Sequence, residues 1–160
     1  MIPREPLVNV LAALSVAAAV AGCAGAAPTA PDPELASLSQ QAQAALATDA
    51  DLLVPVRHIM EAYREGVQIV FADARTRLDY DYGHIPGAVH VPYFDPIPYL
   101  GELPRDRLIV AYCECPHAEA VQVAEALLEN GFRRVKVIDE GLAGWTESGG
   151  VLQSAATGGG

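Results

Sequence analysis

Leu108-Ile-Val-Ala-Tyr112, followed directly by Cys113-Glu-Cys-Pro-His117, sets an apolar run beside two thiols and an imidazole. An uninterrupted apolar run of this length is typical of a strand buried on both faces of a parallel sheet. From Pro116 onward apolar residues recur at helical spacing, and Asn130-Gly131 is a helix stop. The stretch therefore predicts a strand, a short loop that opens at Cys113, and a helix.

The turn at Cys113 is where we expect the chemistry of the chain. A turn from a strand into a helix gathers backbone N–H groups and the positive end of the helix dipole around one point. A cysteine held there is expected to be a stabilised thiolate, and thiolates are both nucleophiles and metal ligands.

Strands and helices alternate along the rest of the chain from about Asp51. Apolar runs predict strands over residues 52–54, 67–72, 88–91 and 134–138; helical spacing covers 57–65, and 92–104 reads as a proline-rich loop. This alternation predicts an α/β domain with a parallel sheet and right-handed crossovers. Asp73, Cys113 and Asp139 would then lie at the carboxyl ends of strands, where such sheets form their sites.

Composition limits the classes of partner. The chain has 160 residues and a net charge of −10. No basic stripe is available to neutralise phosphates, which argues against a nucleic-acid partner. Three cysteines are too few for a disulfide framework. The length is that of one domain with its own core.

The N-terminus predicts an exported protein. Leu7 to Ala21 is an apolar segment that is short for a membrane span, and Val20-Ala-Gly-Cys23 resembles a bacterial lipobox. We expect a signal peptide over 1–22, a lipidated Cys23 with a flexible tether over 23–50, a domain over 51–153, and a disordered tail over 154–160. The protein would sit in the cell envelope of a bacterium, held to a membrane by its lipid and facing the periplasm. A plain secretory signal or an uncleaved anchor is the alternative.

Four motifs, in order along residues 53–153, resemble the rhodanese (sulfurtransferase) family. They are Phe71-Ala-Asp-Ala-Arg75, Tyr82-Gly-His-Ile-Pro-Gly-Ala88, Val110-Ala-Tyr-Cys113, and the segment from Gly131 to Trp145. The resemblance implies a single rhodanese-like α/β domain whose central parallel sheet is flanked by helices. It also implies an architectural pair, Asp73 and Arg75.

The resemblance further implies a mechanism. Cys113 would be the nucleophile that takes sulfane sulfur as a persulfide, and the donor would be a small sulfur compound. The acceptor would be a thiol, best supplied by a protein, and no cofactor is needed. The cradle around the sulfur would comprise Glu114, Cys115, His117, Ala118 and Glu119.

The loop departs from the family pattern, so other functions stay open. It has no glycine, arginine or lysine, and Glu114 and Glu119 would repel a dianionic donor. Pro116 suits the first helical position, which gives Cys115 its own claim to be the nucleophile. The alternatives are a non-catalytic interaction module, a dithiol redox pair of Cys113 and Cys115, and a soft-metal site that adds His117.

Overall fold

The computed structural model describes residues 33–47, 51–114 and 117–155. The chain divides into two units, Met1–Ala30 and Pro31–Gly160, and all of the described residues belong to the second. The predicted signal peptide, Cys23, Cys115, Pro116 and most of the predicted tail lie outside the described residues.

The described residues form one sheet of parallel strands, as the alternation of elements predicts. The strand order is β1-β5-β4-β2-β3, so β4 lies in the middle between β5 and β2. The strands are β1 Leu53–Val54, β2 Ile69–Asp73, β3 Val89–His90, β4 Leu108–Tyr112 and β5 Val135–Ile138. The α/β class and the parallel sheet are thereby confirmed.

Helices connect and cover the strands. They are α1 Pro33–Ala47, α2 Val56–Arg64, α3 Arg77–Tyr82, the 3-10 helix η1 Ile97–Glu102, α4 Ala118–Glu129 and α5 Gly141–Glu147. The helix predicted to begin at Pro116 is α4, and it begins later, at Ala118, with His117 as its N-cap. The segment 92–104 is not simply a loop, since η1 lies within it.

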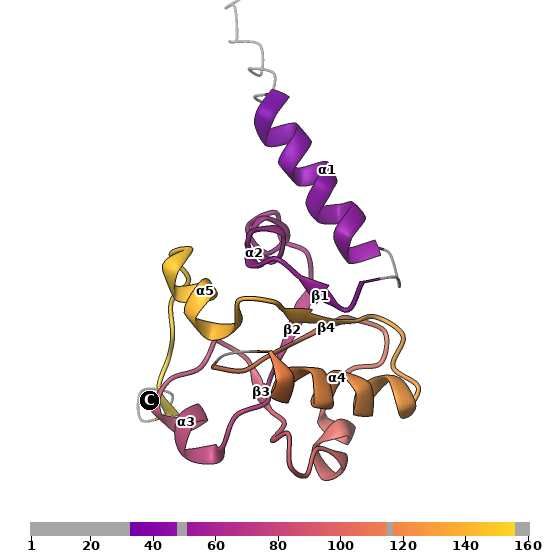
Figure 1. Ribbon diagram of the computed structural model, residues 1–160, viewed down its shortest axis with the longest axis vertical. Helices are drawn as coiled ribbons and strands as arrows, with labels where there is room; N and C mark the ends of the chain where they lie inside the picture. The colour runs from indigo at the N-terminus through magenta and orange to yellow at the C-terminus, as the bar shows by residue number, and fades with distance from the viewer. Residues whose placement is uncertain (1–32, 48–50, 115–116, 156–160) are drawn as a thin grey trace, which may run out of the picture. The chain divides into compact units, whose positions relative to one another are not determined.

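The sheet separates two apolar cores. Side chains alternate along β4: Ile109, Ala111 and then Cys113 belong to the core beneath α4, whereas Val110 and Tyr112 belong to the core beneath α2 and α5. Figure 1 shows α2 and α5 on one side of the strands and α4 on the other. Burial on both faces explains why this strand is apolar at every position.

α4 covers its face of the sheet with a narrow apolar stripe. Four of the five apolar positions predicted for this helix are buried, namely Ala120, Val123, Ala124 and Leu127. Leu128 is 44% exposed, because it lies beside the stripe rather than on it.

Trp145 anchors α5 to the sheet through aromatic contacts. Trp145 is 1% exposed, and its ring meets Phe71 edge-on with centroids 5.2 Å apart. The indole Nε1 donates to the carbonyl of Val151 at 3.1 Å. This confirms the prediction that Trp145 is a core residue.

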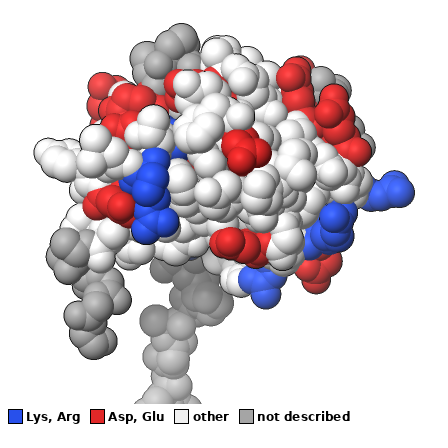
Figure 2. All heavy atoms as spheres, turned by 90° about the horizontal axis from the view of Figure 1, so that it is seen from below, with Lys and Arg blue, Asp and Glu red and all other residues white. Residues whose placement is uncertain are grey.

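α1 lies in the segment predicted to be a tether. It packs against α2, where Ala42 is fully buried and the Ser39 hydroxyl donates to Glu65. Among the described helices, none has both the length and the apolar character needed to cross a bilayer. On the face drawn in Figure 2, basic side chains occur in separate places among acidic and uncharged ones, without a continuous basic area.

Candidate active site

Cys113 lies at the carboxyl end of the central strand. It follows β4 directly, is 1% exposed, and packs in the core that α4 covers. In the sheet register Asp73 lies opposite Tyr112 and Ala111 opposite Val137. The ends of β2 and β5, with Asp73 and Asp139, therefore flank the thiol, as predicted for the carboxyl edge of a parallel sheet.

The first turn of α4 points its amides at the sulfur. Hydrogen bonding from the backbone N–H groups of Ala120 and Glu119 acts to lower the pKa of the Cys113 thiol. These donors stabilise a negative charge on the sulfur, as expected at a helix N-terminus. The strand-to-helix turn thus gives the cysteine the kind of surroundings that the sequence predicts.

The expectation of an acidified thiol is nevertheless wrong. Burial raises the pKa of Cys113 above its ordinary value, and the carboxylates of Glu119 and Asp73 raise it further. The two amide hydrogen bonds act in the opposite direction but do not compensate. The thiol therefore stays protonated near neutral pH unless a bound donor or acceptor changes its surroundings.

We expect Glu119→Gln to make the Cys113 thiol more reactive. Removing this carboxylate should lower the thiol pKa, and each unit lowered gives about tenfold more thiolate at a pH below the pKa. A several-fold faster alkylation by iodoacetamide at pH 8 is expected. Variant and parent rates should converge above both pKa values, and the difference should shrink at high salt.

The alkylation is measured in a chain whose other two cysteines, Cys23 and Cys115, are serine. Glu125→Gln is the matched control, because Glu125 is an exposed acid further along the same helix. Equal rates for the Glu119 variant and its parent, or an equal gain from the Glu125 variant, would contradict the prediction.

A second segment, at the start of α5, contacts the backbone of the cysteine loop. The N–H of Leu142 donates to the carbonyl of Cys113 at 2.8 Å. Gly141 has φ +62°, and a Cβ there would lie 2.6 Å from the Cys113 carbonyl oxygen and 2.9 Å from that of Glu114. Only glycine fits this approach, so Gly141 sets the position of the loop. The sequence reasoning missed this role; the Glu140-Gly141 pair after a strand is the signal that was available.

Asp73 and Arg75 form a buried ion pair beneath the site. Arg75 Nη2 lies 2.7 Å from Asp73 Oδ2, and Arg75 Nε donates to Asp73 Oδ1 at 3.0 Å. Tyr112 donates its hydroxyl to Asp73 at 2.8 Å and accepts the N–H of Ile85. Burial and the charge of Asp73 raise the pKa of Tyr112, so this hydroxyl keeps its proton. The network fixes the ends of β2 and β4.

Arg75 also reaches the cysteine loop. Burial works to lower the pKa of Arg75, but the hydrogen bonds and charge of Asp73 raise it above the ordinary value. Its Nη1 lies 2.9 Å from Glu114 Oε2, and its Nη2 donates to the carbonyl of Gly83 at 2.6 Å. The loop has no arginine or lysine of its own, and Arg75, two residues after β2, supplies a cation instead. Glu114 is held by that cation, although its side chain remains 69% exposed.

His117 is held by the turn after β5. Its Nδ1 lies 3.1 Å from Asp139 Oδ1 and 3.2 Å from the Asp139 carbonyl oxygen. The imidazole thus closes the loop against the neighbouring strand end. Ala118 starts α4 and is exposed. Of the predicted cradle, Glu119 influences the pKa of the sulfur through its backbone and its charge, while Glu114 and His117 are bound to Arg75 and Asp139.

The metal alternative includes a residue that the structure does not describe. Among residues 33–47, 51–114 and 117–155, no group of three or more His, Cys, Asp or Glu side chains is placed to hold a metal ion. The proposed set of Cys113, Cys115 and His117 depends on Cys115, so it stays a hypothesis.

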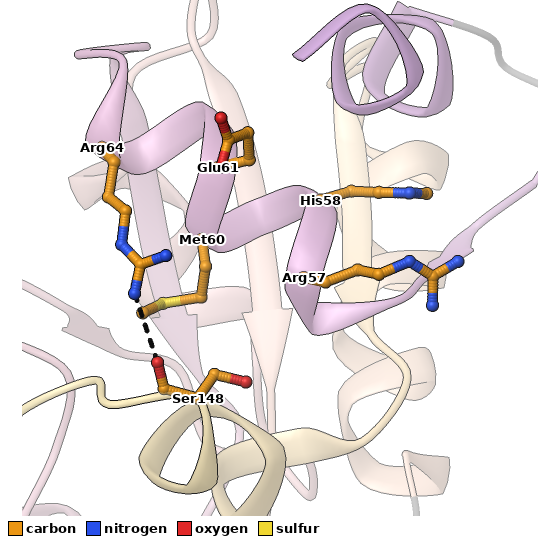
Figure 3. A pocket seen from close by; sticks show the side chains of 6 residues that line it. All are labelled: Arg57, His58, Met60, Glu61, Arg64 and Ser148. Carbon is orange, nitrogen blue, oxygen red and sulfur yellow. Dashed lines mark hydrogen bonds between the residues drawn. The ribbon is translucent and has the colours of Figure 1, made fainter. Parts of the chain in front are cut away.

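A hollow of about 230 Å³ lies away from the cysteine, between α2 and the residue that follows α5. Figure 3 shows Arg64 and Met60 directed toward Ser148, with Arg57 and His58 pointing away from them, and Arg64 donates to the Ser148 carbonyl at 3.3 Å. Both ring nitrogens of His58 are buried without a hydrogen-bond partner in the described part of the chain. Burial and the charge of Arg57 lower the pKa of His58. The lining does not converge on one point, so it does not define a binding site.

His84 and His90 have structural roles. His84 is 3% exposed, stacks on Tyr80 with ring centroids 3.8 Å apart, and bonds the Tyr80 carbonyl through Nδ1 at 2.7 Å. His90 Nε2 lies 3.0 Å from the Arg75 carbonyl oxygen. These rings secure the turns around β3.

Comparison with known proteins gives a family match. Residues 56–148 match the model of the rhodanese-like domain. An HTH-type transcriptional regulator of Mycobacterium tuberculosis is 30% identical over 118 residues, which are 74% of this chain and 51% of that protein. A sulfurtransferase of Allochromatium vinosum is 32% identical over 82 residues, which are 51% of this chain and 75% of that protein. The chain thus spans about half the length of the first relative and three quarters of the second.

Solved structures share the fold. The rhodanese-like domain of an Anabaena sp. protein has a TM-score of 0.59 and 25% identity, covering 69% of this chain and 86% of that one. The thiosulfate sulfurtransferase of Pseudomonas aeruginosa has a TM-score of 0.56 and 20% identity, covering 75% of this chain and 23% of that one. The similarities support a sulfurtransferase-type role at the level of the family. With its match across residues 56–148, the chain belongs to the rhodanese-like domain family.

Proposed function

We propose that this chain transfers sulfane sulfur through a persulfide on Cys113. The observation that carries the proposal is the place of Cys113, directly after the central strand and in one core with the first turn of α4, where the Ala120 and Glu119 amides act to lower the thiol pKa. The same two donors can stabilise the charge of the thiolate before transfer and of the persulfide after it.

The reaction is a pair of sulfur displacements. The Cys113 thiol first gives its proton to solvent, and the thiolate attacks the sulfane sulfur of the donor. The bond between that sulfur and the donor breaks, and the donor remainder leaves with the electron pair. An acceptor thiolate then attacks the outer sulfur of the persulfide, which forms the acceptor persulfide and returns Cys113 as a thiolate.

The charges around the cysteine favour a neutral sulfur donor and a protein thiol acceptor over a dianionic reactant. Glu119 lies next to the sulfur, and the exposed carboxylate of Glu114 follows it in the chain. Like charges at such short range repel a dianion such as thiosulfate. A neutral organic polysulfide as donor and a protein thiol as acceptor avoid much of this repulsion.

The test is the intact mass of the purified full chain after exposure to thiosulfate or to an organic polysulfide. A gain of one sulfur, roughly 32 Da, that cyanide removes is expected from the chemistry of a persulfide. The polysulfide should load faster than thiosulfate. No cyanide-labile gain from any donor would overturn the proposal.

The proposed place of action is the envelope of a bacterium, with the protein anchored to a membrane through lipid on Cys23. This part of the proposal is supported by the apolar segment over 7–21 and by Val20-Ala-Gly-Cys23. Mass spectrometry of the membrane fraction tests it. A lipid-modified Cys23 at the mature N-terminus is expected, and an intact Met1 or an unmodified Cys23 would contradict it.

A further inference from the structure

An apolar surface lies beside the cysteine loop and has no role in the fold. Leu78 is 79% exposed and Tyr82 is 89% exposed, and the two lie four residues apart on the same side of α3. Val151 is 68% exposed and Leu152 is 41% exposed. We call these four residues the α3 surface. Large apolar side chains that gather in one place are typical of an interaction site.

The two parts of the α3 surface are joined in the fold. Leu152 Cδ1 lies 3.6 Å from the position of a Cβ at Gly83, the residue after Tyr82. His84 and Gln153 form an antiparallel bridge, with N–H to carbonyl distances of 2.9 and 2.8 Å. Figure 1 shows α3 and the yellow C-terminal segment side by side. The C-terminal segment therefore lies against the residues that directly follow α3, although the two are distant in the sequence.

The α3 surface is connected to the cysteine through Arg75. One end of the guanidinium donates to the carbonyl of Gly83, and the other pairs with Glu114. Gly83 directly follows Tyr82, and Glu114 directly follows Cys113. A molecule seated on the α3 surface thus lies next to the loop that carries the thiol.

The charge around the α3 surface is negative. Arg77 pairs with Asp81 at 2.9 Å, and Arg75 with the buried Asp73 at 2.7 Å. The first pair balances, but Arg75 is shared between Asp73 and Glu114, so one negative charge of these three groups remains, together with that of Asp79 in α3. A second copy of this acidic chain would be repelled, whereas a partner with basic residues would be attracted.

We propose that the α3 surface binds the protein that accepts sulfur from Cys113, and that this partner carries apolar residues and lysine or arginine beside its reactive thiol. The proposal rests on the proposed function. Apolar contact with Leu78 and Tyr82 would anchor the partner, and the acids would orient it so that its thiol faces the loop.

The experiment compares three acceptors of sulfur from the loaded full chain. Two are synthetic peptides of equal length with one cysteine each; one has leucine and lysine around the cysteine, the other serine and glutamate. The third is cyanide, which is too small to need a docking surface. The leucine–lysine peptide should accept sulfur with at least about fivefold higher kcat/KM than the serine–glutamate peptide.

The double variant Leu78→Ser/Tyr82→Ser should reduce this preference, because the apolar contact is lost while the acids remain, and it should leave the rate with cyanide unchanged. Leu128→Ser is the matched control, since Leu128 is an exposed leucine at the far end of α4. It should leave all three rates unchanged. Sedimentation of the parent and double variant tests the other occupant, because a dimer that only the parent forms would assign the surface to a second copy.

The outcomes separate the two proposals. Three outcomes would overturn the docking proposal alone. They are equal rates for both peptides from a loaded chain, a preference as large in the double variant as in the parent, and such a dimer. Absence of any cyanide-labile sulfur in the parent chain would overturn the proposed function and the docking proposal with it.

Discussion

Cys113→Ser should abolish the uptake of cyanide-labile sulfur, whereas Cys115→Ser should retain it. A serine hydroxyl at position 113 keeps the shape of the loop but is not a sulfur nucleophile. A loss of at least about a thousandfold is therefore expected in loading. Cys113 is the better candidate because it directly ends β4 and receives the Glu119 and Ala120 amides.

Both variants are made in a chain with Cys23→Ser, so that each retains one of the two loop thiols. Intact mass after exposure to polysulfide is the measurement, and thermal unfolding shows that each variant still folds. Loss of loading only in Cys115→Ser would exchange the roles of the two thiols. Loss in both, with a decrease of about 2 Da in the parent, would indicate a redox pair. No loading even in the parent would favour an interaction module or a metal site.

The fold could be predicted because its central signals are local. The apolar run at 108–112 faces a core on each side, and parallel strands follow from the alternation of strands and helices. α5 could not be predicted in this way. It contains Gly141 and Gly144, which disfavour helix, and tertiary burial of Leu142 and Trp145 sustains it instead.

The site could be predicted only where it depends on local geometry. The position of Cys113 at a strand end, facing helix amides, follows from the order of elements. The Arg75–Glu114 pair could not be predicted, because the two residues are 39 positions apart and meet only in the folded sheet. The raised pKa of Cys113 depends on its depth of burial, which no motif encodes.

Gly141→Ala should disable the site and weaken the fold together. At φ +62° an L residue costs about 1–2 kcal/mol. The added Cβ would also lie 2.6 Å from the Cys113 carbonyl oxygen and 2.9 Å from the Glu114 one, and these are backbone atoms that cannot turn aside. The hydrogen bond from Leu142 N–H to the Cys113 carbonyl should break as the segments separate. A total loss of about 2–4 kcal/mol is expected in the free energy of unfolding.

Gly66→Ala is the control that separates the cost of the left-handed backbone conformation from the cost of the steric contact with the cysteine loop. Gly66 also has a positive φ, +82°, but a Cβ there meets nothing within 4 Å. Its cost should be that of the backbone conformation alone, about 1–2 kcal/mol, and its sulfur loading should equal that of the parent. Denaturant unfolding gives the stabilities, and loading is measured where both variants are folded. Because Gly141 touches the cysteine loop and Gly66 does not, equal stability and normal loading in both variants would show that the loop does not depend on this contact.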